Sequence, residues 1–104
     1  MTNADLKAMY RQLHRKYFKG ELNPDMIVRL DKDIEIEYGH VYGVFEPPEE
    51  ILINPKIKNF SEIVQVTILH EMVHASLGIH NHHGMRFQAR IVELFNQGAY
   101  DGLL

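Results

Sequence analysis

Apolar side chains recur every three or four positions near the start of the chain, and basic residues lie between them. The apolar positions are Leu6, Met9, Tyr10, Leu13 and Tyr17. This spacing predicts an amphipathic helix from Asp5 to Lys19, with one face that covers a core. Thr2 or Asn3 can cap its start, and Gly20 can end it.

Short apolar segments separated by glycine and proline occupy the middle of the sequence. They run from Met26 to Leu30, from His40 to Phe45 and from Ile51 to Ile53. Because they are short and bounded by turn residues, these segments predict β-strands. The connections between them are too brief for helical crossovers, so we expect a small, mostly antiparallel three-stranded sheet.

Helical spacing returns in the second half of the chain. One helix is predicted from about Ser61 to Leu77, and its apolar residues on nearly every side are typical of a buried helix. Asn59 or Ser61 can cap it, and Gly78 can close it. A last helix is predicted from Gly84 to about Gln97. The side chains expected to face inward on it are Phe87, Ile91, Leu94 and Phe95.

Composition narrows the class of protein. A length of 104 residues favours one domain over residues 1–104. Apolar residues make up 45% and charged residues 24%, as in soluble globular proteins. The net charge of -3 gives no general basis for binding nucleic-acid phosphates. The pattern therefore predicts an α+β fold with an N-terminal helix, a small sheet, a buried helix and a C-terminal helix.

The chain contains no cysteine, which excludes disulfides, thiolate metal sites and cysteine nucleophiles together. Because small secreted domains commonly depend on disulfides, we expect a reducing, cytoplasmic setting. The sequence does not open with a signal-peptide pattern, and no apolar run reaches the length of a membrane span. We therefore expect neither a leader nor a membrane partner.

Histidines are concentrated in one short part of the sequence: five of the seven lie from His70 to His83. The segment from His70 to His74 reads HEMVH, which is the HExxH pattern, inside the predicted buried helix. Residues four apart share one face of a helix, so both imidazoles can bind one ion. Burying these polar groups in an apolar helix is costly, and a bound cation would offset that cost.

Glu71 follows the first of these histidines and is turned by roughly 100° around the helix axis. It therefore flanks the ion, where a carboxylate can take a proton from a water that zinc activates. A catalytic zinc takes three protein ligands and keeps one position for water. Spacing alone leaves four candidates for the third ligand, namely His80, His82, His83 and Glu93.

The order of several motifs resembles the SprT-like metalloproteases, which include the Spartan-type enzymes. The matching segments are Tyr17 to Leu22, Ile51 to Pro55, His70 to His74, and His83 to Phe87, which is similar to the HGxxF element of the family. The resemblance implies a zincin-like, zinc-dependent endopeptidase in which His70, His74 and His83 bind the metal. It further implies that Glu71 is the general base and that Phe87 packs beside His83.

The turn from Gly78 to His83 is short and rich in histidine, unlike the family pattern, and it leaves alternatives open. With His80 as third ligand, the spacing matches a metal-dependent endoribonuclease of the YbeY type. A non-catalytic module stabilised by zinc is a further alternative, and a closed site of that kind needs four protein ligands. Glu71 argues against both, because neither calls for a base at that position.

The oxyanion donor and the substrate site also stay open. Candidate donors are Tyr42, His80, His82, Arg86 and Tyr100. We expect an extended protein or peptide substrate to pair with an exposed sheet edge, from Gly39 to Glu46 or from Ile51 to Ile53. Many SprT-like proteins carry separate DNA-binding parts, so the resemblance allows an association with nucleic acid that the charge of this chain does not support.

Overall fold

The amphipathic N-terminal segment forms helix α1 (Asn3–Tyr17) in the computed structural model, which describes residues 1–78 and 83–103. Thr2 caps this helix, as predicted. Its hydroxyl accepts a hydrogen bond from the amide of Asp5, whose carboxylate accepts one from the amide of Thr2. The helix ends at Tyr17 instead of Lys19.

The strands β1 (Ile27–Leu30), β2 (Gly43–Glu46) and β3 (Glu50–Ile53) form one sheet in the order β1–β3–β2. Strands β2 and β3 are antiparallel, whereas β1 is parallel to β3. The predicted α+β fold with a small three-stranded sheet is confirmed. The sheet is mixed, because β1 pairs with β3 in parallel where antiparallel pairing was expected. The chain reverses through the short helix α2 (Ile34–Tyr38) and strand β2 before it returns beside β1.

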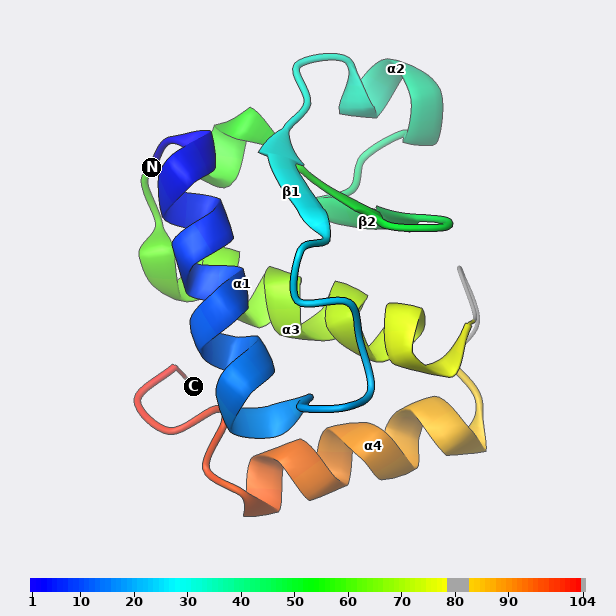
Figure 1. Ribbon diagram of the computed structural model, residues 1–104. Coiled ribbons are helices and arrows are strands. Elements are labelled where there is room, and N and C mark those ends of the chain that lie inside the picture. Colours follow the sequence, from blue (N-terminus) through cyan, green and yellow to red (C-terminus); the bar gives the residue numbers. More distant parts are fainter. Residues whose placement is uncertain (79–82, 104) are drawn as a thin grey trace.

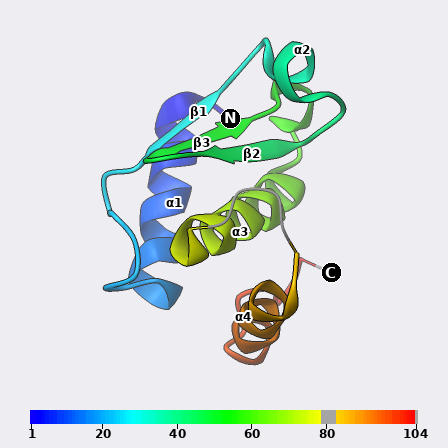
Figure 2. The ribbon, with the colours of Figure 1, turned by 90° about the vertical axis from the view of Figure 1, so that its right-hand side faces the viewer.

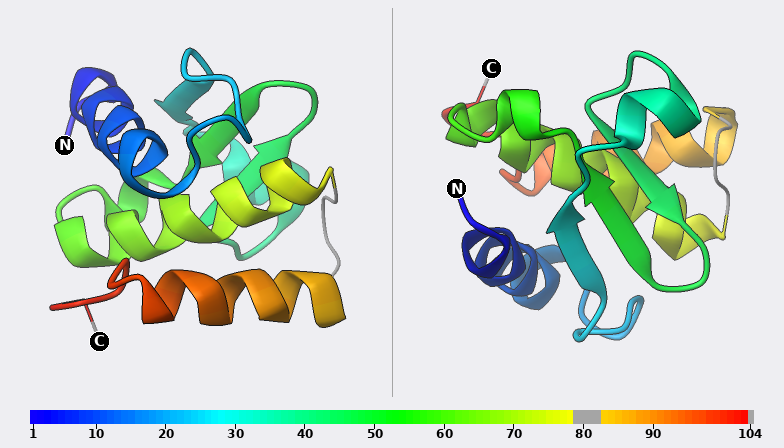
Figure 3. Two further views of the ribbon diagram at one scale, coloured as in Figure 1. Left: turned by 60° about the horizontal axis from the view of Figure 1, so that its bottom comes forward. Right: turned by 90° about the horizontal axis from the view of Figure 1, so that it is seen from above.

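Strand β3 is central (Figure 3), and its apolar side chains are buried on both faces of the sheet. Ile51 and Ile53 belong to the main core, while Leu52 packs on the opposite face with Ile34 of α2 and Val44 of β2. Burial on both faces explains the uninterrupted apolar run in this strand. Residues 51–53 therefore form no edge of this sheet, and one of the two expected substrate edges is wrong.

Helix α3 (Ser61–Leu77) lies between the sheet and helix α4 (Met85–Asn96), as Figures 1 and 2 show. The short 3₁₀ helix η1 (Pro55–Ile57) leads into α3, and the two long helices run side by side in opposite directions (Figure 3). The bounds of α3 agree with the prediction, and Gly78 closes it in the left-handed conformation. Phe60 occupies the N-cap position without a side-chain cap, so the expected caps Asn59 and Ser61 are wrong.

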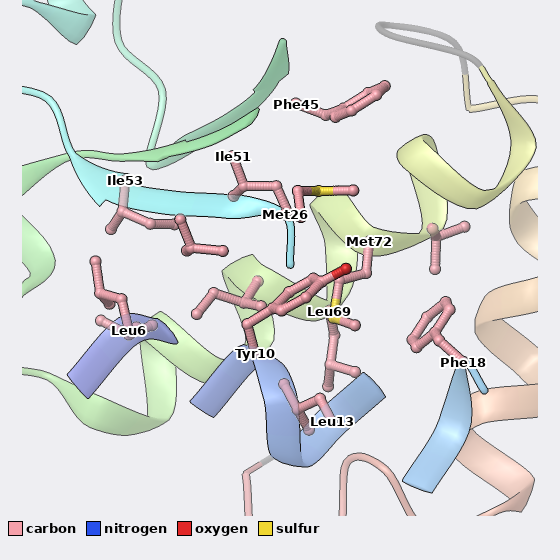
Figure 4. Close-up of a cluster of buried hydrophobic side chains, with 14 of the residues drawn as sticks. Leu6, Tyr10, Leu13, Phe18, Met26, Phe45, Ile51, Ile53, Leu69 and Met72 are labelled. Atoms are coloured by element: carbon pink, nitrogen blue, oxygen red, sulfur yellow. The ribbon is translucent and has the colours of Figure 1, made fainter. Parts of the chain in front are cut away.

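The main core fills the space between the sheet, α1 and α3 (Figure 4). Its largest fully buried side chains include Tyr10, Phe18, Ile51, Leu69 and Met72. The whole core cluster takes side chains from α1, the three strands, α3 and α4, so it fixes α3 in the centre of the fold. Among the described residues, no helix is long and apolar enough to cross a membrane.

Helix α4 packs on α3 through one face. Phe87 and Leu94 are buried as predicted, and Ile91 is partly buried. Phe95 is 60% exposed, so its predicted inward orientation is wrong. Arg90 is buried on this face instead, because ionic and backbone partners compensate its charge.

Candidate metal centre

Three histidine side chains from two segments converge beside the C-terminal half of α3. His70 and His74 lie one turn apart on α3, and His83 directly precedes Gly84, the N-cap of α4. The Nε2 atoms of His70 and His74 are 3.3 Å apart, and each lies 3.1 Å from Nε2 of His83. The three nitrogens thus form a nearly equilateral triangle that could hold a metal ion.

The triangle has the dimensions of one face of a tetrahedral metal site. Nitrogens at about 2.05 Å from a tetrahedral ion are separated from each other by about 3.3 Å. Hydrogen bonds alone do not satisfy such a triangle, because the Nε2 of a neutral imidazole is either a donor or an acceptor. At least two of the three atoms would be of the same kind and would repel. A cation that accepts three lone pairs removes this conflict, so the residues fit a divalent metal.

Phe87 of α4 closes one side of the centre. The centroid of its ring lies 4.6–5.0 Å from the ring centroids of His70, His74 and His83. Burial lowers the pKa of His70, and the neighbouring His83 lowers it further. Both effects favour the neutral imidazole, which is the form that binds metal.

Glu71 lies next to the triangle but is directed toward the sheet. Its Oε1 accepts a hydrogen bond of 3.0 Å from the backbone amide of Phe45 on β2. The residue is 5% exposed, and burial raises the pKa of Glu71 to about 7, while the hydrogen bond from Phe45 acts in the opposite direction. A carboxylate that exchanges its proton near neutral pH suits general acid–base catalysis.

A cavity of about 280 Å³ opens beside Glu71 and His70. Its walls are Val66 and Thr67 of α3 on one side and residues 41–43 on the other. Strand β2 approaches α3 closely at this point, and a Cβ atom on Gly43 would lie 2.6 Å from Cγ2 of Thr67. Glycine is therefore required by the close approach of β2 to α3.

Asn54 holds the outer wall of this cavity in place. Its side-chain amide donates hydrogen bonds of 2.9 Å to the carbonyl of Val41 and to Glu35, and its backbone amide donates one of 2.8 Å to the carbonyl of Tyr42. Its side-chain oxygen accepts a hydrogen bond of 3.0 Å from the amide of Lys56. Because Asn54 is buried, these bonds fix the loop that precedes β2.

A second cavity of about 280 Å³ lies on the other side of His70, between α3 and α4. Tyr100 lines this second cavity, and Tyr42 lines the first. Burial raises the pKa of Tyr100, so its hydroxyl keeps its proton at neutral pH. Arg86 is exposed on the first turn of α4. The choice of oxyanion donor stays a prediction, and two further candidates, His80 and His82, lie outside the described residues.

Glu93 lies away from the metal centre. Its side chain is 63% exposed, and its carboxylate pairs with the guanidinium of Arg90 at 3.5 Å. The expectation that Glu93 could serve as third ligand is therefore wrong for this arrangement. The corresponding alternatives His80 and His82 lie outside the described residues, and His83 is the candidate that the structure brings to His70 and His74.

The model of the SprT-like family matches residues 6–100 of the chain. The chain belongs to the SprT-like family. The family is associated with metallopeptidase-like activity, and the resemblance inferred from the motifs is confirmed. No curated protein and no solved structure matches this SprT-like chain.

Three contacts described for this SprT-like chain were not predicted from the sequence. The amide of Phe45 is a main-chain group, which leaves no signature in the side-chain pattern. Asn54 lies within the Ile51–Pro55 motif, so its place in that motif was an available signal. Arg90 follows Phe87 by three positions and precedes Leu94 by four, and this spacing places it on the buried face of α4.

Proposed function

We propose that this SprT-like protein is a zinc-dependent metalloendopeptidase. His70, His74 and His83 would hold Zn²⁺, and Glu71 would act as general base. The observation that supports this proposal is the triangle of Nε2 atoms beside a buried carboxylate that does not take part in it. Three nitrogen ligands leave one position of a tetrahedral zinc for water, as catalysis requires.

When bound, zinc would polarise a water molecule and the carbonyl of the scissile peptide bond. The carboxylate of Glu71 would accept a proton from that water and return it to the leaving nitrogen. The amide of Phe45 would keep Oε1 of Glu71 in place during both transfers. Burial of Glu71 supports this role, because a desolvated carboxylate binds a proton more readily than an exposed one.

The outer edge of β2 would bind the substrate as an added strand. The amide of Phe45 points away from β3 toward Glu71, and amides two residues apart in a strand point to the same side. The amide of Gly43 therefore also faces the outer edge. Main-chain pairing there would bring a peptide past Glu71, and the mainly apolar cavity beside Gly43 would favour an apolar side chain.

Two alternatives receive less support. A closed structural site needs four protein ligands, whereas the candidate group within the described part of the chain has three. The endoribonuclease alternative depends on His80, which lies outside that part, and the net charge of -3 does not favour nucleic acid. We propose further that the substrate is a protein or peptide. The same proposal places the protein in the cytoplasm, without a membrane partner.

The test measures zinc content and cleavage of a dye-quenched unfolded protein on the same samples. Glu71→Gln should keep one equivalent of zinc and lose cleavage by about 10²–10⁴-fold, because the amide side chain cannot accept the proton. His83→Ala should bind zinc more weakly. Glu37→Gln, which removes an exposed carboxylate on α2, should leave both properties unchanged.

Cleavage by Glu71→Gln at the wild-type rate would exclude this residue as the base. A parallel reaction with RNA distinguishes the endopeptidase from the endoribonuclease alternative. If the protein degrades RNA and leaves the protein substrate intact, the proposed endopeptidase function is wrong. Zinc-bound wild-type protein that cleaves neither substrate would instead favour a structural metal site.

A further inference from the structure

Arg90 makes an extensive set of contacts far from the triangle of histidines. Its Nη2 donates to the backbone carbonyl of Tyr17 at 2.5 Å and lies 2.9 Å from Oε2 of Glu21. Its guanidinium carbon lies 4.8 Å from the ring centroid of Phe18. Only 10% of its side chain is exposed, and a buried guanidinium is stable only when such partners replace its water.

These partners belong to the segment Tyr17–Glu21, which comprises the last residue of α1 and the start of the connection to β1. Phe18 in this segment is fully buried in the main core, so the segment is a fixed support. Arg90 therefore connects α4 to the N-terminal part of the chain, in addition to the packing of α4 on α3. The planar guanidinium contacts a carbonyl, a carboxylate and an aromatic ring at once, which a lysine ammonium cannot reproduce.

Arg90 shares a helix face with Phe87, three positions earlier, and Phe87 contacts the rings of all three candidate ligands. His70 and His74 are placed by α3, which is held between the sheet and α4. His83 is different, because it directly precedes α4 and its position follows that of this helix. A shift of α4 along α3 would therefore move His83 out of the triangle.

We propose that Arg90 is a positioning residue for the metal centre. It anchors α4 on the segment Tyr17–Glu21 and so places His83 beside His70 and His74. The affinity for zinc, and not only the stability of the fold, then depends on a contact made two helical turns away from the ligand. The inference rests on the proposed metal centre but does not require that the protein cleaves peptides.

The test is the zinc dissociation constant, measured by competition with a chromophoric chelator. Arg90→Lys keeps the charge but loses the planar fork, and it should raise the Kd for zinc by about tenfold or more, as changes around metal ligands commonly do. In a His83→Ala background, the same substitution should change the Kd by less than about twofold, because the ligand on which Arg90 acts is absent. A larger effect of Arg90→Lys on the zinc Kd when His83 is present is what a residue that positions His83 should produce.

Glu21→Gln is the second variant, because it keeps the size and the acceptor oxygen and removes the charge that pairs with Arg90. It should raise the Kd for zinc about twofold to fivefold, less than Arg90→Lys. If Arg90→Lys does not fold, the zinc Kd of Glu21→Gln tests the proposal instead. An unchanged Kd for Glu21→Gln would then contradict it.

A purely structural role predicts a lower melting temperature of the metal-free protein with an unchanged Kd, and that result would overturn the inference. An equal loss of affinity in the His83→Ala background would overturn it too. Zinc affinity that responds as expected in a protein without peptidase activity would contradict the proposed function alone.

Discussion

The two outer strands of the sheet present their edges in different ways. On β1, the amide of Leu30 donates a hydrogen bond of 2.8 Å to the side-chain oxygen of Asn3, and the carbonyl of Met26, just before the strand, accepts one of 2.6 Å from Lys7. Both partners come from α1. On β2, the amide of Phe45 binds the carboxylate of Glu71 on α3. One edge is thus covered by capping side chains, whereas the other faces the candidate catalytic base.

A small sheet of this kind can have one edge covered by side chains and leave the other edge for the proposed substrate. Exposed strand edges attract other chains, and polar side chains from a neighbouring helix prevent such pairing. The side chains of α1 provide this cover on β1. The helix beside β2 instead carries two of the candidate metal ligands and the proposed base, so a chain that pairs with β2 would arrive at the centre of the proposed chemistry.

The largest effect on this comparison is expected from Gly43→Ala. The added Cβ would lie 2.6 Å from Cγ2 of Thr67 and 3.2 Å from the carbonyl oxygen of Leu52, so β2 or α3 must shift. Overpacking of this kind lowers the free energy of unfolding by about 1–3 kcal/mol. Displacement of the β2 edge should reduce cleavage by about tenfold or more at a temperature where the variant is folded. Circular dichroism melting and cleavage of unfolded protein provide the two measurements.

Thr67→Ser supplies the matched control for this prediction. Serine lacks Cγ2 and keeps the hydroxyl, which donates a hydrogen bond to the carbonyl of Ile63. The Gly43→Ala/Thr67→Ser pair should therefore recover part of the lost activity. If the double variant is as inactive as Gly43→Ala alone, contact between these two side chains is not the cause.

A smaller effect is expected from Asn54→Ala, which acts on the loop beside β2. The carbonyl of Val41 and the amide of Lys56 lose their partner, so the free energy of unfolding should fall by about 1–2 kcal/mol. The KM for peptide cleavage should rise severalfold more than kcat falls, because the loop forms a wall of the cavity and Glu71 keeps its contact with Phe45. A loss of kcat with an unchanged KM would contradict this assignment.

The smallest effect is expected from Asn3→Ala on the opposite edge. Removal of one exposed hydrogen bond to the amide of Leu30 should lower the free energy of unfolding by about 0.5–1 kcal/mol in urea denaturation. Cleavage at 25 °C should remain at the wild-type level, since the edge of β1 takes no part in the proposed site. A clear loss of activity in a folded Asn3→Ala protein would remove the distinction between the two edges.

Local signals in the sequence were sufficient for the three long helices α1, α3 and α4. The bounds of α3 agree with the prediction because its long apolar pattern and the glycine at its end are both contained within the segment. The same segment contains His70, Glu71 and His74, whose mutual geometry follows from helical spacing. The structure confirms the predicted placement of these residues on α3. Their roles in metal binding and catalysis stay predictions.

Contacts between distant segments could not be predicted in the same way. The parallel pairing of β1 with β3 depends on the crossover through α2, and the five-residue segment Ile34–Tyr38 is too short to show a helical period. The position of His83 beside His70 and His74 depends on where α4 lies, which spacing along the chain does not determine. Asn54 and Arg90 act through backbone groups of other segments, so their partners became known only from the fold.

The hydrogen bond between Phe45 and Glu71 has a consequence for how this site tolerates sequence change. Its donor is a main-chain amide, which every amino acid except proline supplies. Substitutions at position 45 can therefore alter packing and still retain the hydrogen bond to the carboxylate. The hydrogen bond that orients the proposed base is thus robust to mutation, because the backbone supplies its donor. Side chains near it can therefore change without loss of this bond.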